Sequence, residues 1–218
     1  MLEKNEEIPE SRPGPVHIAQ SFSDLGNTYY SEGKLELALR YYEQALALLE
    51  PIGTSIDIAM CLNNIGTVYH TQGNLKRALG SYERALALLE SGSNPQANDP
   101  KAIAICLNNI GTVYHSQGVL EEALIYYEEA LSLRKQTGDA VGIAQSLSHI
   151  GFVYQQQGQL MQAVERFVRV LDLYEHLGSE LEPEVAEVLD GLATCYTQLG
   201  EFEKSLAIKS RSRNWNKS

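Results

Sequence analysis

The string Leu-Asn-Asn-Ile-Gly-Thr-Val-Tyr-His occurs twice in this chain of 218 residues, at 62–70 and again at 107–115. Weaker copies lie on both sides of these two. Aligned on the glycine of the string, the copies stand at Gly26, Gly66, Gly111, Gly151 and Ala193, at intervals of 40, 45, 40 and 42 residues. Self-similarity at a nearly fixed period is typical of repeat architectures, so the chain is expected to fold as a stack of five similar units.

Each unit contains two stretches with the periodicity of an amphipathic helix. Leu62, Ile65 and Tyr69 recur at steps of three and four residues, and so do Ala78 and Tyr82 further along the unit. A second glycine follows seven residues after the first position in every unit, at Gly33, Gly73, Gly118, Gly158 and Gly200. Glycine accepts the left-handed backbone that commonly ends a helix, which predicts a turn between two antiparallel helices.

Residues near this turn have predictable roles. Asn74 follows the turn glycine and can cap the second helix. Gly66 and Ala78 are small, which indicates that the two helices of the unit approach each other closely at these positions. Tyr82 is expected to supply bulk where the next unit stacks.

The order Leu-Gly-x-x-Tyr, then Gly, then Ala, then an aromatic residue and a further Ala resembles the tetratricopeptide repeat family. The resemblance covers residues 16–209 and implies an all-α, right-handed superhelix, or solenoid, of five helix-turn-helix repeats. The expected repeats are 16–52, 55–92, 100–137, 140–177 and 182–209. Because they exceed the family's usual length of about 34 residues, they are similar to those of kinesin light chains and Leu-Gly-Asn-rich G-protein signalling modulators.

The ends of the stack are expected to differ from its middle. Residues 1–15 are rich in proline and are predicted to be a flexible segment, and 210–218 are predicted to be a basic tail. Ser205 and Lys209 replace the small residue and the aromatic residue of the fifth unit, which predicts a polar end where stacking stops. The loop Ser91–Pro100, rich in Pro, Gly and Ser, is expected to project at the edge.

Composition limits the partners and the compartment. The chain has 17 basic and 28 acidic residues and a formal charge of -11, which disfavours nucleic acid and anionic membranes as partners. Cys61, Cys106 and Cys195 are too few for a disulfide framework and are expected to be buried free thiols. With no signal peptide and no apolar run long enough to cross a bilayer, a cytoplasmic location is predicted.

No motif for catalysis or cofactor binding is present. The sequence lacks a glycine-rich phosphate loop, a Gly-x-Ser-x-Gly elbow and a His-Glu-x-x-His pair. The five histidines lie on different expected helices, and no two have the spacing of metal ligands. The chain is therefore not expected to be an enzyme or to bind a cofactor or a metal.

A polar stripe on the first helix of each unit is the candidate binding surface. If Leu62 and Ile65 face the core, helix geometry turns the neighbouring polar residues to the other side, which in the resembling family is a concave, partner-binding groove. The candidate peptide-binding residues are Asp24, Asn27, Asn63, Asn64, Thr67, His70, Asn108, Asn109, Thr112, His115, His149 and Phe152. Asparagine and histidine can bond the main chain of a peptide whatever its sequence.

The family resemblance assigns the peptide-holding role most directly to Asn64 and Asn109, which precede the Ile-Gly pair, and less directly to Asp24 and His149. The alternative is that Asn63, Asn64, Asn108 and Asn109 only cross-link neighbouring helices.

These features predict a monomeric, non-catalytic scaffold that binds a peptide or helical segment of a partner protein in the concave groove. Asp24 near one end of the groove and Glu187 and Asp190 near the other favour a partner with basic flanks. Two alternatives stay open. One is a regulatory peptide or ligand sensor whose superhelix curvature changes on binding, and the other is a structural subunit that assembles through its ends.

Overall fold

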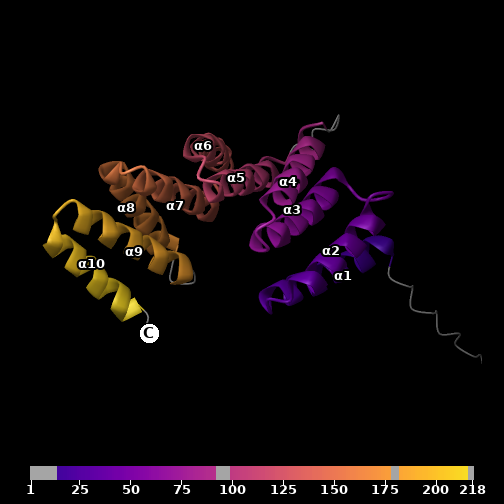
Figure 1. Ribbon diagram of the computed structural model, residues 1–218. Helices are drawn as coiled ribbons and strands as arrows, with labels where there is room; N and C mark the ends of the chain where they lie inside the picture. Colours follow the sequence, from indigo (N-terminus) through magenta and orange to yellow (C-terminus); the bar gives the residue numbers. More distant parts are fainter. Residues whose placement is uncertain (1–13, 92–98, 178–181, 216–218) are drawn as a thin grey trace, which may run out of the picture.

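The computed structural model describes residues 14–91, 99–177 and 182–215, with the backbone alone at 182–183 and 211–215. This part of the chain is all-α. Its helices are α1 (Pro15–Ser31), α2 (Leu35–Leu49), α3 (Ser55–Thr71), α4 (Leu75–Glu90), α5 (Pro100–Ser116), α6 (Leu120–Thr137), α7 (Ala140–Gln156), α8 (Leu160–Leu177), α9 (Glu182–Gln198) and α10 (Phe202–Trp215). Figure 1 shows them as five hairpins in a row. No helix of the described part combines the length and apolar composition that a membrane span requires.

The hairpins form an arch because the two helices of each hairpin occupy different layers. Every helix packs on the helix before and after it, and α3, α5, α7 and α9 also contact one another in series. In the described part of the chain no two even-numbered helices make comparable contact. The odd-numbered layer is therefore the tighter, inner one, and the even-numbered helices spread apart on the outside (Figure 1). The predicted five-hairpin α-solenoid is confirmed.

The turn within each hairpin has the predicted left-handed glycine. Gly73 has a φ of 74°, and its N–H donates to the carbonyl of His70 at 2.9 Å. The next N–H, of Asn74, donates to the carbonyl of Tyr69 at 2.8 Å. This pair of bonds is a Schellman motif, and it recurs in the other four hairpins. Asn74 also caps α4 as predicted, since its side chain accepts a bond from the N–H of Arg77.

The glycine of the repeated string makes room for an aromatic ring. A Cβ placed on Gly66 would lie 2.5 Å from a ring carbon of Tyr82, so the ring of α4 fills the space that a side chain would need. The same arrangement joins Gly26 to Tyr42, Gly111 to Tyr127 and Gly151 to Phe167. Gly66 is thus small because the ring of Tyr82 packs against it. The sequence-based expectation of a close crossing of the two helix backbones at Gly66 gave a different reason. Tyr82 also packs with Ile110 and Val113 of the next repeat, as predicted.

The described ends extend further as helix than the sequence indicates. Helix α1 begins at Pro15, where proline suits the first helical position because it needs no N–H partner there. At the other end α10 continues to Trp215, through part of the segment expected to be a tail. The remainder of both terminal segments, 1–13 and 216–218, and most of the predicted loop, 92–98, lie outside the described residues.

The last hairpin does not end in a uniformly polar face. Ser205 is buried and donates to the carbonyl of Ala193 at 2.9 Å, so it keeps the small buried position of the repeat. Phe202 and Leu206, however, are 62% and 67% exposed. Leu206 stands at the α10 position that corresponds to Val164 in α8, which is buried in the core shared with α9. The end of the stack is therefore polar at exposed Lys204 and Lys209, as expected, but apolar at Phe202 and Leu206.

Candidate functional site

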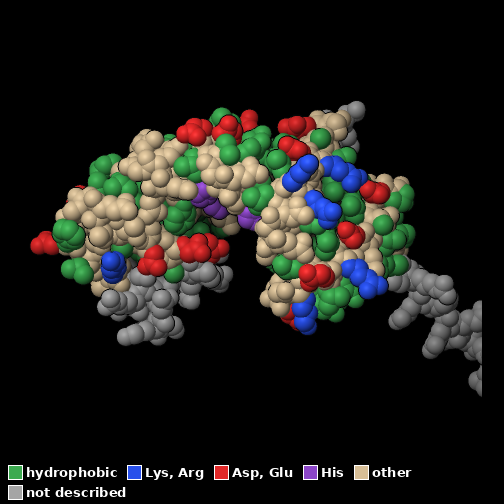
Figure 2. Space-filling view, viewed as in Figure 1, with side chains coloured by type: hydrophobic (Ala, Val, Ile, Leu, Met, Phe, Trp, Pro, Cys, Tyr) green, Lys and Arg blue, Asp and Glu red, His purple; other side chains and the backbone are tan. Residues whose placement is uncertain are grey.

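The predicted binding residues all lie on the inner layer, on α1, α3, α5 and α7. Figure 2 shows histidine side chains inside the hollow of the arch. Asp24 and Asn27 are exposed, whereas Asn63 and Asn108 are only 3% and 7% exposed. The half-buried members are Asn64, Thr67, His70, Asn109, Thr112, His115, His149 and Phe152. The fold thus brings the twelve to one layer but not to one open surface.

Asn63 and Asn108 join neighbouring inner helices. The amide nitrogen of Asn63 donates to Sγ of Cys106 at 3.0 Å, and its oxygen accepts from the amide of Asn109 at 3.2 Å. The oxygen of Asn108 lies 3.1 Å from Nδ1 of His149. The prediction that these two asparagines face an open groove is wrong, because the next inner helix packs over the position that follows Leu62 or Leu107. Helix periodicity separates core from surface but cannot reveal that third contact.

Three further candidates are occupied by tyrosine hydroxyls of their own hairpin. Tyr82 Oη donates to Oγ1 of Thr67 at 3.2 Å. The same bond, always 15 residues apart, joins Tyr42 to Asn27 at 2.7 Å and Tyr127 to Thr112 at 3.2 Å. In the fourth hairpin the two corresponding residues are Phe152 and Phe167, whose rings pack edge to face at 4.9 Å. Because the acceptor disappears together with the hydroxyl, comparison of the repeats could have revealed this pairing from sequence.

A ladder of hydrogen bonds joins the ends of the inner helices. Tyr30 Oη lies 2.9 Å from Oγ1 of Thr71, Nε2 of His70 lies 2.9 Å from Oγ of Ser116, and Nε2 of His115 lies 2.8 Å from Oε1 of Gln156. Each bond spans one junction between successive odd-numbered helices. His70 and His115 thus cross-link successive repeats, and both side chains are half-buried. Burial lowers the pKa of His70, so its neutral form is favoured in the folded chain.

His149 is held between hairpins in its neutral form. Its ring stacks on Tyr127 at 4.8 Å between centroids. Burial lowers its pKa to about 4, and the charges of Arg134 and His115 act in the same direction. Since the oxygen of Asn108 can only accept, the proton of the neutral ring is on Nδ1.

Arg134 is the other buried cation-forming group at this junction. Its Nη1 donates to the carbonyl of Gly142 at 2.6 Å and to Oγ of Ser146 at 2.9 Å. Burial lowers the pKa of its guanidinium, while the nearby carboxylate of Asp139 opposes that shift. Sequence reasoning missed this residue, because a single arginine near the end of a helix carries no signal that it will be buried.

The open part of the inner surface lies between α1 and α3. A cavity of about 240 Å³ there is lined by Gln20, Ser23, Asn27, Met60 and Asn64, with Cys61 among the apolar residues beneath. Within the described part of the chain, the side chain of Asn64 makes no hydrogen bond. Of the four asparagines in the Asn-Asn pairs, Asn64 is the one whose whole amide bonds none of the described residues.

Charge lies at the two ends of the inner layer. Asp24 on α1 and Glu187 and Asp190 on α9 are all exposed.

All three cysteines are buried and free, as predicted, and burial raises the pKa of each thiol, to about 11 for Cys106. Among the described residues, no group of three His, Cys, Asp or Glu side chains could hold a metal ion.

Solved structures with this architecture come from several kinds of protein. BtubC (BKLC) from P. vanneervenii shares 19% identity with a TM-score of 0.81, covering 93% of this chain and 81% of its own. A putative kinesin light chain from Podosopora anserina shares 17% sequence identity with a TM-score of 0.68, and the match covers 94% of this chain and 97% of that one. A Rap protein complexed with competence and sporulation factor shares 17% with a TM-score of 0.79, covering 94% of this chain and 56% of its own. At such identities the likeness is one of fold alone.

Comparison with known families accounts for nearly the whole described chain. No curated protein matches the sequence. A family model described as tetratricopeptide repeat matches residues 17–91 and 142–214, and a second model with the same description matches residues 103–137. These matches cover all five hairpins found in the structure. The chain therefore belongs to the tetratricopeptide repeat family.

Proposed function

We propose that this protein is a non-catalytic interaction scaffold that binds an extended segment of a partner polypeptide on its inner surface, at the α1–α3 end. The tetratricopeptide fold is generally a repeat scaffold without catalysis. The observation that carries the proposal is the 240 Å³ cavity at that end, whose rim holds the amide of Asn64. Two Rap proteins of the same architecture have been solved with competence and sporulation factor and with a Phr* peptide.

The residues around the cavity suit a peptide main chain with a neutral centre. Asn64 offers both a donor and an acceptor, so it can bond an N–H and a carbonyl of an extended segment at once. Met60 is exposed at the same rim and supplies a flexible apolar surface. Asp24 lies exposed on α1, and a basic flank on the partner would complement its charge.

The centre of the inner surface has a supporting role in this proposal. Asn63 and Asn108 fix α3 on α5 and α5 on α7, so they hold the curvature of the arch and do not contact the partner. Binding is therefore restricted to the first two hairpins, and the alternative that the asparagines cross-link helices applies to the buried pair.

A comparison of two corresponding asparagines tests the proposal. Asn64 and Asn109 occupy the same position of successive repeats, but Asn109 is bonded to Asn63, whereas the Asn64 side chain bonds none of the described residues. A fluorescein-labelled peptide library with lysine flanks and neutral centres is titrated against the full chain by fluorescence anisotropy. Asn64→Ala should weaken the best ligand about tenfold without changing the melting temperature. Asn109→Ala should lower the melting temperature instead.

Unchanged affinity in Asn64→Ala contradicts the proposal, and so does an equal effect of both substitutions on affinity. Asp24→Asn serves as a test of the flank, since it should weaken lysine-flanked peptides more than unflanked ones. Equal weakening of both peptide sets would mean that Asp24 does not contact the flank.

Assembly through the ends is the second candidate function. It is favoured by exposed Phe202 and Leu206 at one end and by Ile18 and Leu25, 38% and 40% exposed, at the other. Leu25 corresponds to Ile65 of the next repeat, which is buried. Light scattering across a range of concentrations tests this candidate. A monomer at every concentration contradicts it and agrees with the prediction from sequence.

A further inference from the structure

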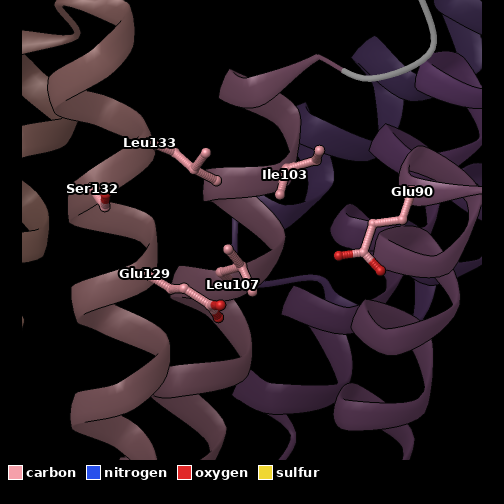
Figure 3. Close-up of a pocket in the computed structure, with 6 residues that line it drawn as sticks. All are labelled: Glu90, Ile103, Leu107, Glu129, Ser132 and Leu133. Atoms are coloured by element: carbon pink, nitrogen blue, oxygen red, sulfur yellow. The ribbon is translucent and has the colours of Figure 1, made fainter. Parts of the chain in front are cut away.

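An apolar groove crosses the outer face of the arch between α4, α5 and α6. Its volume is about 340 Å³, and its floor is formed by Ile103 and Leu107 of α5 with Leu133 of α6. Figure 3 shows the carboxylates of Glu90 and Glu129 entering from opposite sides, with Ile103 and Leu107 between them. Acidic side chains also gather along the outer edge of the arch over α4 and α6 in Figure 2. This groove faces away from the inner surface discussed above.

The preceding junction shows the corresponding groove with opposite charges on its two walls. Between α2, α3 and α4 the positions of Glu90 and Glu129 are held by Glu50 and Arg84. Nη2 of Arg84 donates to Oε1 of Glu50 at 2.7 Å, so an arginine on one wall of the groove bonds the carboxylate on the other. The repeat geometry therefore places a guanidinium within bonding distance of the carboxylate on the opposite wall.

The following junction has the opposite charge at these two positions. Between α6, α7 and α8 they are held by Lys135 and Arg169, which line a groove of about 570 Å³. At these two positions the first of the three junctions thus carries an ion pair, the second carries two acidic residues and the third carries two basic residues. Of these, the α4–α5–α6 groove is the acidic one.

The two carboxylates have no cation of their own among the described residues. Neither Glu90 nor Glu129 forms an ion pair there. The segment 92–98, which joins α4 to α5, contains no Lys or Arg in its sequence. Two like charges beside an apolar floor repel each other, and a guanidinium placed between them would bond both.

We infer that this outer groove is a docking site for an arginine of a partner polypeptide, together with an apolar side chain next to that arginine. Arginine is favoured over lysine because its planar guanidinium can bond two carboxylates at once, while its carbon chain lies along the leucine and isoleucine floor. The volume is at the small end of ligand sites, about 300–1,000 Å³, so it receives one or two side chains rather than a whole helix.

The neighbouring repeat supplies the variant that tests this site. Glu129→Arg reproduces the Glu50–Arg84 arrangement, so it should close the groove with an internal ion pair and leave the fold intact. The probe is a short acetylated and amidated peptide with a central Leu-Arg-Leu, titrated into the isotope-labelled full chain and followed by NMR. We expect shifts at Ile103, Leu107 and Leu133, and binding at least about tenfold weaker in the variant.

Three controls separate docking from general charge attraction. Glu43→Arg makes the same change of charge at an exposed site on α2 and should leave binding unchanged. The peptide with Leu-Gln-Leu should bind at least about tenfold more weakly than Leu-Arg-Leu. Arg84→Glu gives the preceding junction two acids, so it should create a second set of shifts at Ile58 and Leu62.

The inference is overturned if Leu-Arg-Leu produces no shifts in the groove, if Glu43→Arg weakens binding as much as Glu129→Arg, or if the glutamine peptide binds equally well. Asn64→Ala should not affect this site. The inference about the outer groove can therefore be wrong while the proposed function of the inner surface is right, and the reverse is also possible.

Discussion

His149 offers a direct measurement of how strongly the stacked hairpins bury a polar ring. The proposed change is His149→Asn, which installs the residue that stands at the same position in the second and third repeats, as Asn64 and Asn109. Asparagine keeps a donor for the oxygen of Asn108 but has no ionisable ring. The substitution should therefore remove one proton-binding group while leaving the local packing close to a pattern that the chain already uses.

The sign of the effect follows from the lowered pKa. In the folded chain the pKa of His149 is about 4, whereas the ordinary pKa of a histidine in water is 6.5. Between these two pH values the unfolded chain binds the proton and the folded chain does not. The contribution of neutral His149 to the free energy of unfolding is therefore fully present above pH 6.5 and decreases as the pH falls towards 4. The free energy of unfolding decreases by about 3 kcal/mol over the whole range, and about 2 kcal/mol of this decrease has occurred at about pH 5.

Urea unfolding followed by circular dichroism, at about pH 8 and about pH 5, gives the difference in free energy of unfolding. The wild type should lose about 2 kcal/mol more than His149→Asn over this range, which corresponds to about 4–8 °C in melting temperature. His17→Asn, at an exposed position on α1, is the control for loss of an imidazole. Equal pH dependence in wild type and His149→Asn, or an NMR titration of His149 with a midpoint near 6.5, would refute the reasoning.

Four other outcomes follow from the packing of the repeats. Gly66→Ala should destabilise the fold by about 1–3 kcal/mol in chemical denaturation, because its Cβ would meet the buried ring of Tyr82; Gly80→Ala, whose Cβ meets nothing within 4 Å in the middle of α4, should stabilise it by about 0.5–1 kcal/mol. Tyr82→Phe should cost about 1 kcal/mol by the same measurement through loss of the bond to Thr67, and a neutral result would mean that water replaces that bond equally well. Cys106 and the other two thiols should react with a thiol reagent only slowly at about pH 8 until urea is added, because they are buried and their pKa values are raised; fast labelling of native protein would contradict this.

Much of the architecture was predictable because it depends on interactions within one hairpin. The turn glycine Gly73, the cap Asn74 and the apolar stripe around Leu62 act over a few residues, and the repetition of each signal in several units reinforces it. For the architecture, local rules were least informative at the ends of the stack. Phe202 and Leu206 follow the repeat pattern, so nothing in their own helix indicates whether another repeat covers them.

The candidate site was less predictable because it depends on contacts between hairpins. Asn63 and Asn64 are neighbours with the same side chain, yet one is buried under α5 and the other opens into a cavity. One step along a helix turns a side chain by about 100°, which is enough to move it from a third packing interface to solvent. Periodicity alone divides a helix into an apolar and a polar face, so both asparagines fell on the polar one.

The sequence by itself determined the unit, which consists of two antiparallel helices and the turn between them, because both are decided by residues close together along the chain. Only the tertiary structure decided which polar side chains hold the stack together and which remain free, and it alone brought Glu90 and Glu129 to one groove. The physical reason is that a junction between repeats is formed by residues from three helices, so its burial and charge balance exist only once the hairpins have stacked.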